Sequence, residues 1–447
     1  MLTLLTIAVA AVVPAADSLP APKVISLEQA LQIALSENAS VKVADMEIRR
    51  AGYARKGAYA ALFPTIDGSA SYQRTIKKQI MYMDFSMPGV DTPPGDAGGI
   101  EVGRWNTYSV AATSAMPLVN AQLWKSLKIS DEDVELAVEK ARNSRLEMVT
   151  QVKQAYFSCL LARDAFSVYR SVYENALENL NQTQRKYNAQ KASDLDLARA
   201  KANLSNAIPN VYDAENSVIL SLWQLKAVMG VSLDENIDVE GQLSDYAEGM
   251  LIDLESLGAD DLERNSTMKQ LEIQARQLYD AIKLQQFANL PSLALAFSYS
   301  RNAMTNDFNF SEYRWSPYSY VGLSLSIPIF SGGKRYNAIR QAKVQAEQLD
   351  VQKQNTERQL QIALRQYLNT METSMKSLGA AQSAVETAQK AYDIAVKSYN
   401  VGRSTLTDLN DAQLVLTQSR LSVSQAIFNF MTAKANLEQT IGNDFIE

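Results

Sequence analysis

The sequence predicts a mainly helical protein with a small β part, organised as two internal structural repeats. The segment 187–197 resembles the segment 399–409, which lies 212 positions later in a chain of 447 residues. The stretches 122–190 and 334–400 contain no proline and are rich in helix-forming residues, so each predicts a helix roughly 100 Å long. After Pro291, the hydrophobic period changes from about 3.6 residues to 2, which indicates strands.

The N-terminal segment 1–16 is interpreted as a signal peptide. Its apolar run from Leu2 to Val13 has the length of a signal-peptide core and is too short to span a bilayer as a helix. Ala15 and Ala16 supply the small residues of a cleavage site. A buried N-terminal strand is the alternative, and the missing basic residues leave the true start codon open. No later stretch approaches about 18 consecutive apolar residues, so a membrane crossing would have to use strands.

The first repeat is expected to span residues 17–230. Ser26 and Gln29 form a capping box at the start of a helical region that ends before Pro64. Alternating residues then predict two strands, which Pro117 closes before a long helix hairpin begins. The predicted boundaries are strands at about 65–83 and 107–116, and a helix hairpin at about 118–230 with its tip near 188–193.

The second repeat, residues 264–447, has the clearer strand pattern. Leu293, Leu295 and Phe297 alternate with small residues, which predicts a strand with one apolar face. Pro328 closes the second strand of this repeat. The predicted boundaries are a helix at 266–289, strands at about 292–301 and 318–329, and a helix hairpin at about 332–442 with its tip near 400–405.

The last predicted helix carries two hydrophobic lines. Residues spaced by seven from Leu409 to Leu437 form one line, and those from Leu414 to Ala435 form a second, about 140° around the helix. Two separated stripes suit a helix with a neighbour on each side, as in a closed wall. An ordinary antiparallel bundle or coiled coil also uses heptads and stays open as the alternative.

Four predicted strands per chain cannot close a membrane barrel, since such barrels start at about eight strands. Open hairpins would expose unpaired backbone edges. Symmetric assembly of two or three chains would solve both problems. A barrel of about eight strands is filled by its own side chains, whereas small inward-facing residues suit an open lumen. A trimer therefore fits better if the protein is a channel.

The composition argues against enzyme chemistry. The chain has no histidine and a single cysteine, Cys159, which lies in an apolar run and is expected to be a buried structural thiol. Histidine catalysis, histidine metal sites and an intrachain disulfide are thereby excluded. The net charge of −6 does not indicate the basic surface that nucleic-acid binding requires. No nucleophile–base set, phosphate loop or metal cluster appears, so we expect neither an enzyme nor a cofactor.

Taken in order, these features resemble the TolC-like outer membrane efflux proteins, or outer membrane factors. The resemblance rests on the paired halves, the Leu-Phe-Pro and Leu-Pro breaks before strands, the Pro-Leu-Val and Pro-Ile-Phe-Ser-Gly-Gly joints, and the Tyr-x-x-Gly turn. It covers nearly the whole chain after the signal segment. It implies a homotrimer whose twelve-stranded barrel lies in the outer membrane of a Gram-negative bacterium and continues into a long periplasmic α-helical barrel.

The resemblance also implies a function as the exit duct of a tripartite multidrug efflux or type I secretion system. Such a duct conducts passively, is gated at its periplasmic helix tips, and joins an RND, ABC or MFS inner-membrane transporter through a periplasmic adaptor protein. A soluble periplasmic helical scaffold is the alternative function. The exported substrate, the pump and the adaptor stay open, because a duct takes its selectivity from its pump.

The segment 231–263 between the repeats contains eleven acidic residues and no basic residue. In the family, this region contributes to an equatorial belt around the middle of the tunnel. A solvated acidic linker explains the sequence equally well. Both interpretations stay open at this point.

The resemblance places the candidate pore constriction in the second hairpin tip. Asp408 and Asp411 share a helix face and match positions that form aspartate rings at the narrowest point of the family's tunnel. Such rings favour cations and can bind them, and crowding of the carboxylates would raise some of their pKa values. Helix capping from Thr405 is the simpler explanation for Asp408, and the same pattern explains Asp196 in the first tip.

Tyr399 matches a gate tyrosine of the family that hydrogen-bonds between helix pairs. The arginine that the family has five residues later is Ser404 here, although Arg403 is adjacent, so the details of the gate stay open. The predicted gate residues are Tyr399, Arg403, Ser404 and Asp196, and the predicted adaptor contacts are Gly402, Lys191 and Ala192.

Overall fold

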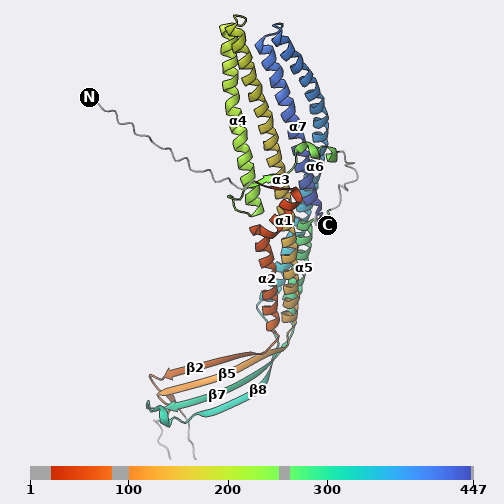
Figure 1. Ribbon diagram of the computed structural model, residues 1–447. Helices are drawn as coiled ribbons and strands as arrows, with labels where there is room; N and C mark the ends of the chain where they lie inside the picture. The colour runs from red at the N-terminus through yellow and green to blue at the C-terminus, as the bar shows by residue number, and fades with distance from the viewer. Residues whose placement is uncertain (1–21, 83–99, 251–261, 444–447) are drawn as a thin grey trace, which may run out of the picture. The chain divides into compact units, whose positions relative to one another are not determined.

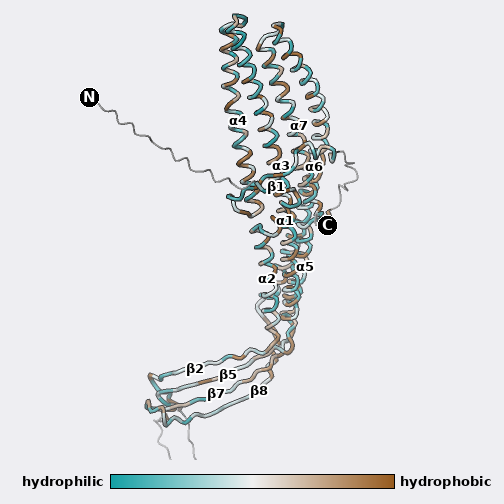
Figure 2. The backbone as a smooth tube through the Cα atoms, in the orientation of Figure 1, coloured by the Kyte–Doolittle hydropathy of each residue, from teal (hydrophilic) through white to brown (hydrophobic). Residues whose placement is uncertain are grey.

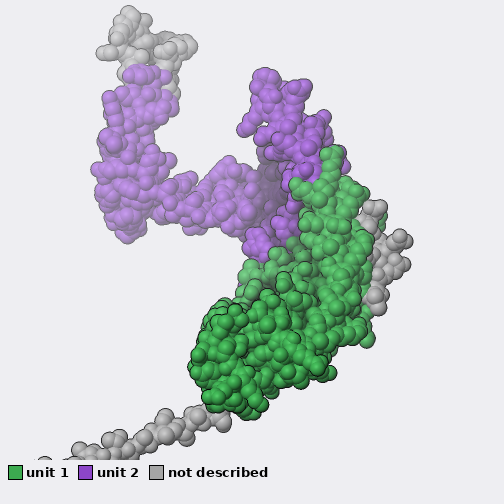
Figure 3. All heavy atoms as spheres, turned by 90° about the horizontal axis from the view of Figure 1, so that it is seen from above, with its two compact units in different colours: residues 1–45, 141–268, 356–447 green, residues 46–140, 269–355 purple. Residues whose placement is uncertain are grey.

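The computed structural model describes residues 22–82, 100–250 and 262–443. The signal peptide predicted at 1–16 lies outside the described residues. The chain divides into two compact units (Figure 3). Unit 1 comprises Met1–Asp45, Ala141–Met268 and Thr356–Glu447, and unit 2 comprises Met46–Lys140 and Lys269–Asn355.

Each repeat contributes one long helix hairpin (Figure 1). Four of the helices supply residues to both units. The described helices include none that is both long and apolar enough to cross a membrane. The helix bounds are α1 Leu27–Glu37, α2 Ala39–Ala60, α3 Ala121–Asn188, α4 Asp194–Met229, α5 Ser266–Phe287, α6 Lys334–Asn400 and α7 Leu406–Ile441.

The helices start and stop at recognisable signals in the sequence. Ser26 caps α1, and the predicted capping box with Gln29 is confirmed because both hydrogen bonds of the box are present. The helices α4 and α7 end at Gly230 and Gly442, each with a left-handed φ of 77°. Pro209 lies inside α4, which continues on both sides of it.

Hydrophobic residues recur at intervals along α4 and α7 (Figure 2). On α7, the line through Leu409, Leu416, Phe430 and Leu437 is buried within unit 1. The second line is less covered, and Leu414 at its tip end is 63% exposed. One stripe of α7 therefore packs inside the protomer, while part of the other remains available to a neighbour.

The core of unit 1 contains large side chains from α3, α4 and α7. Tyr156, Phe157, Leu225 and Phe430 are each at most 1% exposed. Cys159 lies in the same core as a free thiol, and burial raises its pKa to about 11. The prediction of a buried structural cysteine is confirmed.

The described part of the acidic segment is packed into unit 1 rather than forming a solvated linker. Its strand β6, Ile237–Val239, pairs in parallel with β1, Lys23–Ile25, near the start of the described chain. Two short 3-10 turns follow, and Leu243 and Met250 from these turns are 0% and 1% exposed. Burial of these side chains offsets the repulsion between acidic neighbours. The turns are η1 Leu243–Tyr246 and η2 Glu248–Met250.

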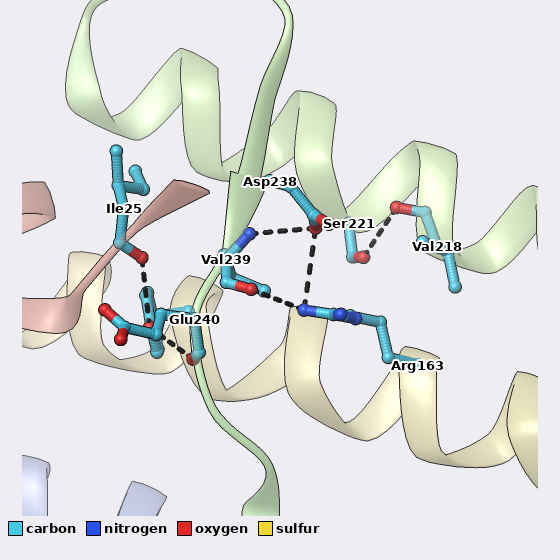
Figure 4. A network of polar contacts seen from close by, with 8 residues as sticks. Ile25, Arg163, Val218, Ser221, Asp238, Val239 and Glu240 are labelled. Atoms are coloured by element: carbon cyan, nitrogen blue, oxygen red, sulfur yellow. Dashed lines mark hydrogen bonds and ion pairs between the residues drawn. The ribbon is translucent and has the colours of Figure 1, made fainter. Parts of the chain in front are cut away.

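Polar side chains of α3 hold the β1–β6 pair in place (Figure 4). The hydroxyl of Tyr156 lies 2.7 Å from the carbonyl oxygen of Glu240 and 3.3 Å from that of Ile25. Arg163 donates a hydrogen bond to a carbonyl of β6 and forms an ion pair with Asp238 at 3.6 Å. The backbone groups at this strand edge are thereby satisfied inside the core.

The β-sheet of unit 2 joins the two repeats. Its strand order is β2-β5-β7-β8, and every neighbouring pair is antiparallel. The central pair β5–β7 brings together one strand from each repeat, while β2 and β8 lie at the two edges. The strand bounds are β2 Thr65–Arg74, β5 Asn106–Val119, β7 Ser292–Thr305 and β8 Ser316–Ser326.

The register of this sheet separates two chemically different faces. Leu295 pairs with Leu323 and Phe297 pairs with Val321, so their side chains share one face, which we call the apolar face. The opposite face is polar or small and includes Asp67, Ser69, Ser71, Ser109, Thr113, Ser298, Ser300 and Ser324.

Several strand boundaries differ from the prediction, and β7 continues to Thr305 instead of ending near residue 301. The first strand ends at Arg74 rather than near residue 83, and a separate two-stranded sheet forms from β3 Gln79–Met81 and β4 Ile100–Val102. Pro117 does not close a strand but lies inside β5, where the register with β7 shifts and accommodates the missing N–H. In the second repeat, β8 ends at Ser326, before the proline that was expected to close it.

Charged groups are buried between α3 and α5 in unit 2. Asp280 is 4% exposed and forms ion pairs with Lys125 at 2.6 Å and with Lys128 at 3.0 Å. Burial opposes ionisation of Asp280, but hydrogen bonds from the two lysines outweigh it and lower its pKa. Glu132 is 7% exposed, and burial raises its pKa, with one carboxylate oxygen lacking a hydrogen-bond partner among the described residues.

Gly442 and Gly402 each follow the end of a helix, and adding a side chain should lower the stability of the protein more at Gly442 than at Gly402. A Cβ at Gly442 would lie 2.2 Å from the carbonyl oxygen of Arg264, whereas a Cβ at Gly402, with a similar φ of +76°, meets nothing within 4 Å. We expect Gly442→Ala to lower the unfolding free energy by about 3 kcal/mol or more and Gly402→Ala by about 1 kcal/mol. Thermal unfolding of the two variants measures the difference, and equal losses would contradict the close approach.

The buried Glu132 predicts a pH-dependent stability. Its folded pKa lies above the unfolded value, so its contribution to stability is present at low pH and lost as pH rises through the folded pKa. We expect Glu132→Gln to raise the unfolding midpoint by a few degrees at pH 8, with the gain shrinking as the pH falls through the folded pKa and largely absent below about pH 4. Glu135→Gln, at a half-exposed carboxylate paired with Arg276, is the control. A loss of stability in Glu132→Gln at pH 8 would refute the argument.

Candidate functional site

The predicted functional residues gather at the tips of the two helix hairpins in unit 1. Both tips turn in the same way. Gln190 and Gly402 have left-handed φ values of 55° and 76°, and the next residue donates its N–H back to Lys186 or Ser398 at 2.8 Å. This is the Schellman termination, in which a left-handed residue ends the helix. The first tip uses glutamine where the second uses glycine, so only the first carries the strain of a side chain at positive φ.

Capping boxes start the return helix of each tip. Thr405 Oγ1 accepts the N–H of Asp408 at 3.1 Å, and the carboxylate of Asp408 accepts the N–H of Thr405 at 2.8 Å. Ser193 and Asp196 form the same pair at 3.1 Å in both directions. The sequence prediction of two caps is confirmed. The carboxylate predicted to belong to a pore ring at Asp408 is thus also the one that starts α7.

These caps keep both carboxylates ionised. Hydrogen bonds from the backbone and hydroxyl of Thr405 lower the pKa of Asp408. Hydrogen bonds from the hydroxyl and backbone of Ser193 lower the pKa of Asp196. Within one protomer, the shift at Asp408 is therefore opposite to the increase expected from crowding in a ring.

Tyr399 ties the two hairpins together. It lies near the end of α6, is 8% exposed, and its hydroxyl is 2.8 Å from the hydroxyl of Thr183 on α3. Lys186 of α3 lies 4.3 Å from the centre of the Tyr399 ring and donates to the Tyr399 carbonyl at 3.1 Å. The ring packs with Leu406 and Leu409 in a small apolar cluster. This contact joins one repeat to the other within a single chain.

The repeat counterpart of Tyr399 is differently placed. Tyr187 is solvent-accessible, and a hydrogen bond with Asp194 of its own tip raises its pKa. The first tyrosine therefore stabilises a local turn, whereas the second connects two hairpins. Repeat position alone did not distinguish these roles.

Sequence reasoning missed the partners of Tyr399. Thr183 and Lys186 come from the first repeat, and the positions 212 residues later hold Ala395 and Ser398. Position 183 holds a threonine, whereas its equivalent in the second repeat, position 395, holds an alanine. This difference between the two copies was the sequence signal available for Thr183. A direct comparison of the two copies would have pointed to Thr183.

The other predicted tip residues form a more open group. Asp411 is exposed and makes no hydrogen bond or ion pair with the part of the chain that the structure describes. Arg403 is also exposed, and Ser404 donates to the carbonyl of Ala395 at the limiting distance of 3.5 Å. Asp196, predicted as a gate residue, bonds within its own cap rather than to Tyr399. Lys191, Gly402 and the partly exposed Ala192 lie in the turns themselves.

A cavity of about 180 Å³ lies between the two hairpins. It is lined by residues of α3, α4 and α7, which include five amide side chains: Asn203, Asn206, Asn210, Asn410 and Gln413. Asn203 of α4 donates to Asn410 of α7 at 2.7 Å, and Gln413 is 6% exposed. The two hairpins are therefore joined on this side by neutral hydrogen bonds, which tolerate small adjustments better than a packed apolar contact would.

Comparisons with known proteins agree with this architecture. A family described as "Outer membrane efflux protein" matches residues 30–231 and 257–443, which is most of the chain and includes both repeats. The chain belongs to the outer membrane efflux protein family. The predicted family and fold class are confirmed, and membership makes the protein an outer membrane transport protein rather than an enzyme. Channels of this family work as trimers with efflux or secretion machinery.

Individual relatives are distant in sequence. "Outer membrane protein TolC" of Escherichia coli strain K12 is 23% identical over 360 residues, covering 78% of this chain and 71% of that protein. TolC of Vibrio cholerae serotype O1 is 22% identical over 243 residues, covering 53% of this chain and 54% of that protein, about half of its length. The solved CmeC outer membrane channel of Campylobacter jejuni superposes with a TM-score of 0.72 at 18% identity, covering 93% and 85% of the two chains.

The contact at Tyr399 predicts unequal effects of removing the two repeat tyrosine hydroxyls. Tyr399→Phe leaves the buried hydroxyl of Thr183 without its partner, so the last turns of α3 and α6 should open more often. We expect their amide hydrogen exchange to accelerate about fivefold, which corresponds to about 1 kcal/mol.

Tyr187→Phe is the matched control, because its hydroxyl bonds only within the accessible first tip. It should leave exchange in α6 unchanged. Equal acceleration of α6 in both variants, or in neither, would contradict a specific link through Tyr399.

Proposed function

We propose that this protein is the passive exit duct of a tripartite efflux or type I secretion system. Three chains form one duct, with a twelve-stranded barrel in the outer membrane and a continuous helical barrel in the periplasm. The observation that carries the proposal is the four-stranded sheet, which has two unpaired edges, one apolar face and one polar face. A sheet of this kind is stable in lipid only when closed with copies of itself.

The strand directions support ring closure by rotation. Because all neighbours in the order β2-β5-β7-β8 are antiparallel, β8 of one chain runs antiparallel to β2 of the next. The apolar face then contacts lipid, and the small and polar residues of the other face line the lumen. Serine, threonine and alanine make up most of that face, and Tyr318 and Tyr320 of β8 are its largest side chains. A twelve-stranded barrel lined mostly by small residues keeps an open lumen.

The helices support a continuous wall below the barrel. The line of α7 that includes Leu414 is partly uncovered in the protomer, while the other line is buried. A neighbouring chain in a trimer would cover the exposed stripe, and its burial would contribute about 25 cal/mol per Å².

The gate of the proposed duct lies at the hairpin tips. Tyr399 holds the second hairpin against the first, Arg403 and Ser404 are the adjacent gate residues, and Asp411 supplies the main carboxylate of the constriction. Asp411 has this role because it is exposed and uncommitted, whereas Asp408 and Asp196 hold their helix caps. Three chains bring six carboxylates of Asp408 and Asp411 to the axis, and such a ring favours and can bind cations.

The partners follow from the position of the tips. A periplasmic adaptor protein contacts the turns at Gly402, Lys191 and Ala192 and connects the duct to an RND, ABC or MFS transporter of the inner membrane. The open backbone around Gly402 supports this contact, since no atom lies within 4 Å of the space a Cβ would occupy. The transported substrate is selected by the pump.

A bilayer recording tests the duct and its ring together. The detergent-extracted protein should have the mass of three chains and conduct ions with a preference for cations. We expect Asp411→Asn to weaken that preference at least twofold and to relieve block by divalent cations, because it removes three charges from the constriction.

Asp196→Asn is the matched control for loss of a carboxylate, because Asp196 lies in the other hairpin tip and is replaced in the same way. It should leave ion selectivity unchanged. Identical selectivity and divalent block in the wild type and Asp411→Asn would overturn the ring, and absence of any conductance would overturn the duct.

A further inference from the structure

The apolar face of the sheet contains a groove that the duct function does not require. Its volume is about 520 Å³, within the range of small-molecule sites. Gly68, Ala70 and Ala112 are on the apolar face and have no bulky side chain, so the groove runs over β2 and β5. Tyr299 and Arg301 of β7 line the same groove. The groove is therefore lined by small residues and by one cationic side chain, that of Arg301.

Arg301 lies at the membrane boundary, given the orientation of the proposed duct. All helix connections leave the sheet at the end where β7 begins, so Thr305 marks the outer end. Arg301 is nine residues beyond Ser292, which places it about 30 Å along the strand. At a strand tilt of about 40°, this corresponds to a height near the outer limit of an apolar band about 25 Å tall.

The guanidinium of Arg301 retains donors for a ligand. Its Nε donates to the hydroxyl of Tyr299 at 2.8 Å, and the charge lies 5.9 Å from the centre of that ring. This contact fixes the side chain beside the groove. No carboxylate of a described residue forms an ion pair with Arg301, so both Nη groups remain available. A planar pair of N–H donors matches the oxygens of a phosphate.

We propose that this groove binds a membrane lipid whose phosphate headgroup carries a net negative charge. Arg301 binds the phosphate of the headgroup, and an acyl chain lies along the groove over Gly68, Ala70 and Ala112. Charge complementarity selects this occupant, because a cation on a lipid-facing surface is best satisfied by an anion of the bilayer boundary. The ligand is a lipid rather than free phosphate, since the apolar groove adds binding only for a molecule with a hydrocarbon chain.

The test uses the purified full-length trimer in detergent. Native mass spectrometry compares retention of dioleoylphosphatidic acid with that of dioleoylphosphatidylcholine, whose acyl chains are the same. The wild type should retain the phosphatidic acid about tenfold better, and Arg301→Gln should abolish most of this preference. Gly68→Val should reduce retention of both lipids, because a Cβ there has free space and the added methyl groups fill the groove.

Two matched variants control for charge and for loss of glycine. Arg340→Gln removes an arginine that also stacks on a tyrosine, at 4.8 Å from the ring of Tyr336 on α6. Gly322→Val makes the same replacement on the polar face of the sheet. Neither should change lipid retention, and the mass of three chains shows that each variant is assembled.

Several results would overturn the proposal. Equal retention of the two lipids by the wild type, or equal loss in Arg301→Gln and Arg340→Gln, would remove the headgroup site. Retention of inorganic phosphate as strong as that of phosphatidic acid would assign the site to free phosphate, and a mass of six chains would assign the groove to a second trimer. Failure of lipid binding in intact trimers leaves the duct standing, whereas absence of trimers overturns both.

Discussion

The structure depends on one constraint, the need to pair every backbone amide and carbonyl at the edges of a four-stranded sheet. Strands β2 and β8 have a partner on one side only, and their peptide groups cannot be left bare in hydrocarbon. Antiparallel pairing throughout allows one edge to meet the other edge of an identical chain. Oligomer formation is therefore a condition for the β part to exist in a membrane.

The helical part meets the same constraint inside each chain. Schellman turns and capping boxes satisfy the backbone groups of the helix ends at both tips. Tyr156 and Arg163 each donate a hydrogen bond to a backbone carbonyl at the β1–β6 pair. The two copies use the same backbone solution with different residues. The two tips share their backbone geometry, and the differences at Thr183, Lys186 and Asp411 between the copies make the tips chemically different.

Much of this architecture could be predicted from local sequence signals. Long proline-free stretches, capping boxes at Ser26, Ser193 and Thr405, and two-residue alternation after Pro291 are properties of neighbouring residues, and each one identified its element correctly. The order of repeats and breaks then led to the family. The individual signals were weak, but they agreed with one another.

What the sequence did not reveal depends on contacts between distant residues. Pro117 ends a strand by local rules, yet a bulge in its pairing with β7 keeps it inside β5. The acidic segment appeared equally suited to solvent until Leu243 and Met250 were found in the core. Thr183 has no distinguishing neighbour in sequence and gains its importance only from Tyr399, 216 residues away.

The hydrogen bond between Tyr399 and Thr183 is weak enough to break and re-form at equilibrium. One hydrogen bond contributes about 1 kcal/mol. Counting that bond alone, one protomer of the proposed trimer would have it broken roughly one-sixth of the time, and all three independent protomers would have it broken together only about 0.4% of the time. In the proposed duct, closure would then be a collective property of three protomers, because three weak contacts must break together before the tips can open.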